Sequence, residues 1–394
     1  MPAPAGSKGL IKPSPSREED REFSIAAALW RGDMTLQSAE EELRGNSAAL
    51  DTLSIETNMT CPLRCVYCYL SDRPTARSAE LSRLSATIAD AADTGVRRFA
   101  FVGKEPLSDD RALTLIRMLD GRPDRNRLHV GLVTNGIFAD RQFAMLSRLQ
   151  LDYLDVSLDG LAEHNDRWRG DGSFEKALHA IERFSAMPGA TLVVNSVLHS
   201  GNMQNLEAFM DTLQDHGGRH FSFAPVLDLN DSVSVAQMCA DPRELLGTVV
   251  RGLAAYAQSH EMCQIMLDLP VGWTMLALQT GVIRWGGVRR DQNGVSYAQP
   301  WDGTRFYIKV QVLPQDTWRW ARITHDGEYL GRLRAAASRD YARRSAGNIS
   351  EMTFTRLFRS SLARSGWVSE EWERALSWAT GLSVSAPPAL RVLG

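Results

Sequence analysis

Three of the five cysteines of the chain lie within the segment TNMTCPLRCVYCYLSD, residues 57–72. Cys61, Cys65 and Cys68 have the spacing C-x3-C-x2-C. An odd number of clustered thiols is a poor disulfide set, and a structural zinc site usually takes four ligands, often as two C-x2-C pairs. Three thiolates can instead bind three irons of a [4Fe–4S] cluster and leave the fourth iron to an outside ligand. The spacing alone leaves zinc and the cluster open.

The composition is that of an ordinary globular protein. The chain has 394 residues, 44% hydrophobic and 23% charged, which is long enough for two or three domains. A formal net charge of −3 gives no electrostatic reason to expect nucleic acid or an anionic membrane as partner. No apolar run approaches the roughly 20 residues of a membrane helix, and the N-terminus lacks a signal-peptide core. We therefore expect a cytoplasmic protein, where clustered cysteines indicate metal or redox chemistry.

Short apolar runs alternate with helical patterns between residues 53 and 227. The predicted strands are 53–59, 97–103, 127–136, 151–160, 191–198 and 220–227, and helices are predicted near 78–94, 109–120, 139–149, 173–185 and 203–216. This alternation predicts an α/β fold with a parallel sheet, and six units suit an open, partial (β/α)6 barrel. The active site of such barrels lies at the C-terminal ends of the strands. Those ends carry the cysteines and the motifs GKEP, TNG and SLDG.

Four regions are expected along the chain. They are a flexible leader with a short helical segment at 1–50, the partial barrel at 51–235, a helical linker with loops at 236–298 and a small α+β domain at 299–394. In the last region, 304–313 and 318–333 alternate like a hairpin, with HDG as a turn signal. Two helices are predicted to follow.

The cysteine loop resembles the radical S-adenosylmethionine (SAM) superfamily, whose signature in this position is C-x3-C-x-aromatic-C. Tyr67 occupies the aromatic position. The resemblance implies that Cys61, Cys65 and Cys68 bind one [4Fe–4S] cluster, whose open iron takes the amino and carboxylate groups of SAM. One electron then cleaves SAM, and the resulting 5′-deoxyadenosyl radical abstracts hydrogen from a substrate. An external electron donor such as flavodoxin or ferredoxin is also implied.

Other motifs on the predicted rim fit this resemblance. GKEP stands where the family has a G-G-E-P loop, which implies that Gly103 and Glu105 reach the SAM ammonium, although Lys104 replaces the second glycine. SLDG resembles the ribose and carboxylate segment, with Ser157 and Asp159 facing SAM. Helix capping would also account for the last two residues.

Three further residues are binding candidates. The stretch EHNDRWRGDGSF resembles one common in peptide-modifying members, which implies that Arg169 clamps a carboxylate through its guanidinium. A surface ion pair is the competing interpretation. Asn195 on the fifth predicted strand and Pro225 near the end of the sixth are positional candidates.

The C-terminal region resembles a SPASM or twitch domain in its HDG turn and its GNISEMTFTRLF segment, but it lacks the cysteines of an auxiliary cluster. The resemblance implies a degenerate domain that acts as a lid or substrate platform; an unrelated α+β appendage is the alternative. Cys239 and Cys263 remain. Buried thiols usually serve as small hydrophobic residues, while Cys239, after the sixth strand, could instead return a hydrogen atom to a substrate radical, as in radical SAM epimerases.

We therefore expect a radical SAM enzyme that modifies a ribosomal peptide in natural-product biosynthesis. The alternative substrate is a small molecule, such as a sugar, aminocyclitol or amino acid, in an epimerase, dehydrogenase or cyclase reaction. A non-catalytic zinc-binding scaffold is the hypothesis from a different class. Neither nucleic acid nor a membrane is an expected partner.

Overall fold

The computed structural model describes residues 17–45, 50–71, 77–226, 238, 241–260, 262–285, 288–290, 296–298, 305–312, 320–331, 344–362 and 367–381. The chain divides into two compact units. The larger unit comprises Ser47–Asp268 and Gln315–Ser365, and the smaller unit comprises Met1–Asn46, Leu269–Pro314 and Gly366–Gly394.

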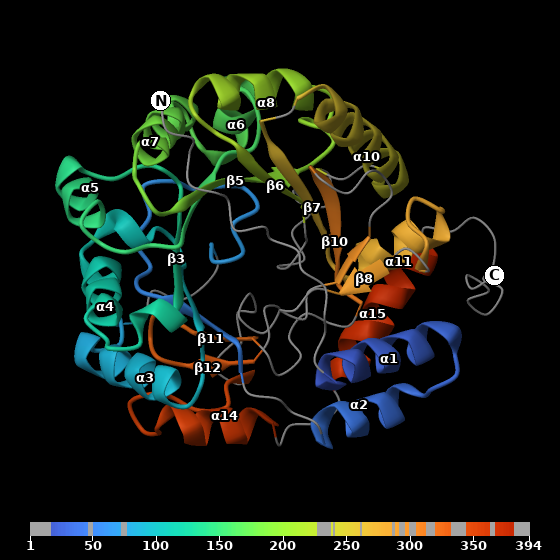
Figure 1. Cartoon of the computed structure of the whole chain (residues 1–394), viewed down its shortest axis with the longest axis horizontal. Helices are drawn as coiled ribbons and strands as arrows, with labels where there is room; N and C mark the ends of the chain where they lie inside the picture. The colour runs from blue at the N-terminus through green and yellow to red at the C-terminus, as the bar shows by residue number, and fades with distance from the viewer. Residues whose placement is uncertain are drawn as a thin grey trace. The chain divides into compact units, whose positions relative to one another are not determined.

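The larger unit contains a curved sheet of parallel strands (Figure 1). In spatial order these are β1 (Thr52–Glu56), β2 (Arg98–Val102), β3 (His129–Thr134), β4 (Tyr153–Ser157), β5 (Thr191–Leu198), β6 (His220–Pro225) and β7 (Gln264–Leu269). Each strand is parallel to its neighbour. Within the described ranges the strand order has two ends and forms no closed ring. The predicted α/β class and open parallel barrel are confirmed.

Helices follow the strands and lie outside the sheet (Figure 1). They are α3 (Leu81–Asp93), α4 (Arg111–Asp120), α5 (Asp140–Leu146), α6 (Ala162–Arg169), α7 (Ser173–Ser185), α8 (Leu206–Asp215) and α10 (Pro242–Ser259), with short 3-10 turns at η1 (Pro106–Ser108) and η2 (Arg125–Arg127). Helix α7 shows why they pack: it buries Phe174, Leu178, Ile181 and Phe184, which recur on one helical face. Helix α6 was not predicted, because AEHNDRWR is short and almost wholly polar.

Alternation along the strands separates the two faces of the sheet. In β4, Leu154 and Val156 are fully buried, while Tyr153, Asp155 and Ser157 lie on the opposite, inner face. The Tyr153 ring lies over Gly131 of the neighbouring β3, where an added Cβ would come within 1.9 Å of the ring. The inner face therefore carries polar side chains below the rim of the barrel.

The C-terminal part of the larger unit adds two strands to the sheet, at the edge of β1 that faces away from β2. Strand β11 (Trp320–Ile323) pairs in parallel with β1, and β12 (Tyr329–Leu330) pairs antiparallel with β11. The turn between them contains Gly327 with φ +93°, which confirms the predicted HDG turn. Helix α14 (Phe354–Leu362) lies beside α3, where Thr355 Oγ1 is 3.5 Å from Asp90 Oδ1.

The first half of the predicted hairpin pairs elsewhere. Residues Phe306–Val310 form β10, which is antiparallel to β9 (Ser296–Ala298), and β9 is antiparallel to β8 (Val288–Arg290). The hairpin pairing between 304–313 and 318–333 is therefore wrong. Alternation fixes which residues share a face of a strand, but it does not identify the neighbouring strand.

The smaller unit also contains α1 (Arg17–Arg31), α2 (Leu36–Gly45), α11 (Val271–Gln279) and α15 (Trp367–Gly381). Tryptophans fill its interior. The Trp30 ring lies 5.3 Å from Trp372 and 5.7 Å from Trp285, and Trp30 Nε1 donates to Val312 O at 3.0 Å. No helix in the described part of the chain is both long and apolar enough to cross a bilayer.

Candidate active site

The cysteine loop follows β1, so it lies at the carboxyl edge of the sheet. All three thiols are partly buried. Burial raises the pKa of Cys61, and raises the pKa of Cys65 to about 12; in both cases negative charge on the nearby Cys68 adds to the effect. These thiols therefore lie within electrostatic range of one another, and their thiolates need a positive partner, as a coordinated metal provides.

The donor set fits an iron–sulfur cluster. Within the described ranges, no three His, Cys, Asp or Glu side chains converge on a position sized for one metal ion. A [4Fe–4S] cluster needs no such convergence, because each thiolate binds a different iron. Three thiols on one short loop therefore match the ligands that the cluster requires.

Backbone and side-chain hydrogen bonds fix this loop against the end of one helix and the ends of two strands. Val66 N donates to Trp168 O at 3.0 Å, at the end of α6. Glu105 N donates to Thr60 O at 3.1 Å, beyond β2. Asn135 Nδ2, beyond β3, lies 3.4 Å from Cys61 Sγ. The motifs that lie far apart in sequence thus meet around the cysteines.

Gly103 and Glu105 shape the turn after β2. Gly103 has φ +125°, so a side chain here would strain the backbone, although an added Cβ would lie at an ordinary contact distance of 3.4 Å from Glu56 Cβ. The Glu105 side chain is fully buried. Its Oε1 accepts from Leu107 N at 2.9 Å and Thr134 Oγ1 at 2.8 Å, and its Oε2 accepts from Asn135 N at 2.7 Å.

Burial raises the pKa of Glu105 to about 7, against the opposing effect of its three donors. Both carboxylate oxygens accept hydrogen bonds from the protein itself, and these bonds join the turn after β2 to the end of β3. The predicted contact between Glu105 and SAM stays a prediction.

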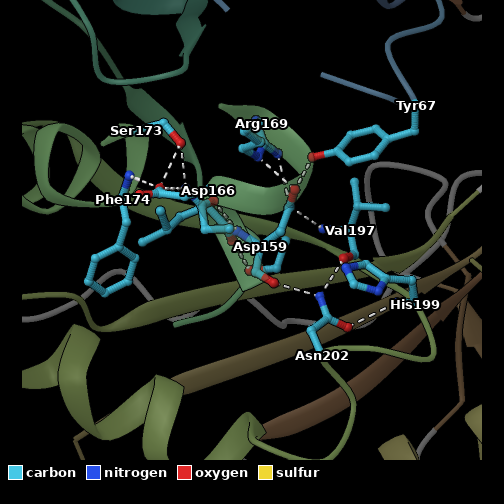
Figure 2. A network of polar contacts seen from close by, with 12 residues as sticks. Tyr67, Asp159, Asp166, Arg169, Ser173, Phe174, Val197, His199 and Asn202 are labelled. Atoms are coloured by element: carbon cyan, nitrogen blue, oxygen red, sulfur yellow. Dashed lines mark hydrogen bonds and ion pairs between the residues drawn. The ribbon is translucent and has the colours of Figure 1, made fainter. Parts of the chain in front are cut away.

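Asp159 is the centre of a buried network beyond β4 (Figure 2). Its side chain is fully buried, and its two oxygens accept from Arg169 Nε at 2.6 Å and Nη2 at 2.9 Å. Val197 N donates to Oδ1 at 2.8 Å, and the Tyr67 hydroxyl donates to Oδ2. Asp159 therefore links the cysteine loop, through Tyr67, to α6 and β5.

Local turns hold this network in place (Figure 2). Asn202 Nδ2 donates to Asp159 O at 2.6 Å, and Asn165 Oδ1 accepts from Asp159 N at 3.1 Å. Asp166 accepts from Gly172 N at 2.7 Å and Phe174 N at 2.8 Å, which ties α6 to the start of α7. The EHNDRWRGDGSF stretch thus positions Arg169.

Ser157 and Asn195 are register partners on the inner face of β4 and β5. Asn195 Nδ2 donates to Asp155 Oδ2 at 3.2 Å. Burial raises the pKa of Asp155 to about 7, and its buried Oδ1 has no hydrogen-bond partner within the described part of the chain. Sequence reasoning missed Asp155, although a carboxylate inside the run YLDVS was a usable signal.

The other candidates from the sequence are the two remaining cysteines and Pro225. Cys239 is outside the described residues. Cys263 is buried at 2% exposure and directly precedes β7, so it lies at the edge of the sheet opposite the cysteine loop. Pro225 ends β6. The position of Cys263 agrees with a packing role.

Comparison with known proteins identifies the segment around these cysteines. The radical SAM superfamily matches residues 55–215, from β1 to the end of α8. A GTP 3′,8-cyclase of Chlorobaculum tepidum is 32% identical over 42% of this chain and 51% of its own length. A PqqA peptide cyclase of Granulibacter bethesdensis is 27% identical over 44% of this chain and 46% of its own length. The chain thus spans about half the length of these curated relatives.

The fold is also similar to that of a solved structure. The crystal structure of Streptococcus suis SuiB bound to precursor peptide SuiA superimposes with a TM-score of 0.65 over 94% of this chain and 75% of that chain, at 14% identity. The radical SAM superfamily uses a [4Fe–4S] cluster and SAM, which confirms the predicted cofactors at the level of the family. Residues 55–215 are therefore the part of the chain that is similar to the radical SAM superfamily.

Proposed function

We propose that the chain is an enzyme that uses a [4Fe–4S] cluster and SAM to modify a ribosomally made peptide. One observation carries the proposal: Cys61, Cys65 and Cys68 lie on the carboxyl edge of an open parallel sheet, beside the ordered pair of Arg169 and Asp159. When bound, the cluster and SAM supply a 5′-deoxyadenosyl radical that removes a hydrogen atom from a substrate C–H bond.

The three cysteines act as cluster ligands. Burial favours the protonated thiols of Cys61 and Cys65 in the metal-free protein, so iron binding there displaces protons. The Asn135 amide is within hydrogen-bonding distance of Cys61 Sγ at 3.4 Å, which reduces the electron density on that ligand.

The SAM-binding residues lie on the same rim. Asp159 uses Nε and Nη2 of Arg169, so Nη1 lies outside this pair and can bind the SAM carboxylate. Ser157 and Asn195, adjacent on the inner face, bind the ribose hydroxyls. Gly103 and Glu105 order the turn that meets the SAM ammonium, and Tyr67 and Asp159 keep Arg169 in place.

A peptide substrate is supported by two likenesses. The fold is similar to that of SuiB, solved with a precursor peptide, and one relative is named a PqqA peptide cyclase. The C-terminal segment, a degenerate SPASM or twitch-like region, is the substrate platform. The second candidate is a small-molecule substrate, because the relative with 32% identity is a GTP cyclase.

The deciding experiment is anaerobic reconstitution with iron and sulfide, followed by reduction and addition of SAM. We expect about four irons per chain and release of 5′-deoxyadenosine. Replacing Cys61, Cys65 or Cys68 with Ala should abolish both, whereas Cys263→Ser, a buried cysteine at the opposite edge, should retain both. One zinc per chain, without colour or 5′-deoxyadenosine, would establish the scaffold hypothesis instead.

The same assay separates the substrate classes and the electron source. Greater 5′-deoxyadenosine release with a pool of synthetic 20-residue peptides supports the peptide substrate, and greater release with GTP supports the small-molecule alternative. Reduced flavodoxin or ferredoxin should replace dithionite as the electron donor. Failure of both proteins to do so would reject them as donors.

A further inference from the structure

Arg322 of β11 contacts both ends of the cysteine loop. Its side chain is 7% exposed, and its Nη1 donates to Glu56 Oε1 at 3.1 Å and to the Tyr69 hydroxyl. Glu56 is the last residue of β1, and Tyr69 directly follows Cys68. One guanidinium nitrogen thus joins the residues on either side of the segment that carries all three clustered cysteines.

We infer that Arg322 is a positioning residue that clamps this loop and holds the three thiols in the arrangement that the cluster requires. The inference rests on the proposed cluster site. Joining the ends of a flexible segment removes conformational freedom that cluster binding would otherwise have to remove. A clamped loop therefore releases a bound cluster more slowly than an open one.

The surroundings of Arg322 allow little alternative placement. Its guanidinium lies 5.4 Å from the centre of the Tyr69 ring and 5.1 Å from the centre of the Trp320 ring, within the range of cation–π contacts. The Glu56 side chain is fully buried. Burying two charges costs desolvation free energy, which their attraction offsets only when both are correctly placed. The Arg322–Glu56 pair therefore adds little net stability, but it strongly favours one geometry of the loop ends.

Further contacts connect the chain after the cysteines to the hairpin formed by β11 and β12. His325 O, in the turn after β11, accepts from Ala79 N at 2.7 Å. Arg111 of α4 donates through Nε to Thr57 O at 2.9 Å and through Nη2 to Ala79 O. A second arginine therefore joins two positions that flank the cysteines. The β11–β12 hairpin and α4 therefore hold the chain at positions on both sides of the cysteines.

Two variants test the clamp. Tyr69→Phe removes the hydroxyl at one end of the loop and leaves the Arg322–Glu56 pair, so the fold should survive. Arg322→Met removes both contacts. The control is Arg125→Met. It removes another arginine whose side chain is only 11% exposed and lies 3.0 Å from both Asp120 and Asp152, with no contact to the loop among its hydrogen bonds.

Hydrogen exchange of loop residues 57–71 is measured in the metal-free full chain, and iron loss to a chelator is measured after anaerobic reconstitution. We expect several-fold faster loop exchange and several-fold faster iron loss in Tyr69→Phe, larger changes in Arg322→Met, and wild-type loop behaviour in Arg125→Met. Wild-type loop exchange in both clamp variants, or an equal change in the control, would overturn the inference. A wild-type chain that binds no iron would overturn the proposed function, while loop exchange still decides whether the clamp exists.

Discussion

Arg169 and Asp159 form a bidentate ion pair, with N–O distances of 2.6 and 2.9 Å, in which the aspartate side chain is fully buried. Two parallel bonds fix the plane of the guanidinium as well as its position. The Tyr67 hydroxyl, one residue before Cys68, shares the same carboxylate. The orientation of Arg169 is thereby coupled to the cysteine loop.

Asp159→Asn should destabilise the protein by about 3–5 kcal/mol, because it leaves the Arg169 charge buried without its counter-charge. Urea unfolding of the metal-free protein measures this change. Asp140→Asn is the matched control: its 2.8 Å pair with Arg183 is formed by a carboxylate that is 93% exposed. That control should lower the free energy of unfolding by less than about 1 kcal/mol. An equal loss of stability in both variants would contradict a larger stabilising role for the buried pair.

Gly103→Ala should weaken SAM binding about tenfold, because φ +125° is unfavourable for alanine and the turn must shift to relieve the strain. Isothermal titration of the reconstituted protein with SAM measures the effect. Gly189→Ala provides the control, since Gly189 has φ +92° but an added Cβ meets nothing within 4 Å. The control should lose stability without losing SAM affinity; unchanged affinity in Gly103→Ala would show that the turn does not position SAM.

The protein should unfold more easily at pH 8 than at pH 5 because of Asp155. Burial raises its folded-state pKa to about 7, above the ordinary aspartate value. The folded protein therefore binds this proton more tightly than the unfolded chain does. The resulting contribution to the free energy of unfolding is complete below the unfolded-state pKa and is lost as the pH rises to about 7. Linkage sets this loss at up to ~4 kcal/mol. Asp155→Asn should make the free energy of unfolding depend less steeply on pH between pH 5 and pH 8, with the remaining slope contributed by Glu105, whose pKa burial also raises to about 7. An unchanged slope would reject the assignment.

Asn135→Ala should make the reduction potential of the cluster more negative. The variant removes the amide donor 3.4 Å from Cys61 Sγ, and hydrogen bonds to cluster sulfurs help to set the potential. A redox titration followed by electron paramagnetic resonance measures the shift. The melting temperature of the metal-free variant is the control for general damage, and a potential equal to that of the wild type would show that the amide does not tune the ligand.

The strands and the rim were predictable because their signals are local. Each of the six predicted strands corresponds to one of β1 to β6, and the polar residues after them converge because parallel strands end at one edge. The cysteine spacing could be interpreted without any tertiary contact.

The partners of the rim side chains were not predictable in the same way. Asp159 was expected to face SAM, yet its oxygens are occupied by Arg169, Tyr67 and Val197. Hydrogen-bond partners depend on the three-dimensional approach of separate elements, which spacing does not encode. Arg322 shows the same limit, because no periodic signal links a residue of β11 to the end of β1.

The placement of β11 beside β1 constrains when the site can be assembled during synthesis. Arg322 is translated 266 residues after Glu56, so a nascent chain that has completed the barrel still exposes β1 as an unpaired edge strand, a hazard for aggregation. Iron delivered to the thiols at that moment would meet a loop with one end unsecured. Metallation of this protein therefore belongs after β11 has been synthesised and has paired with β1.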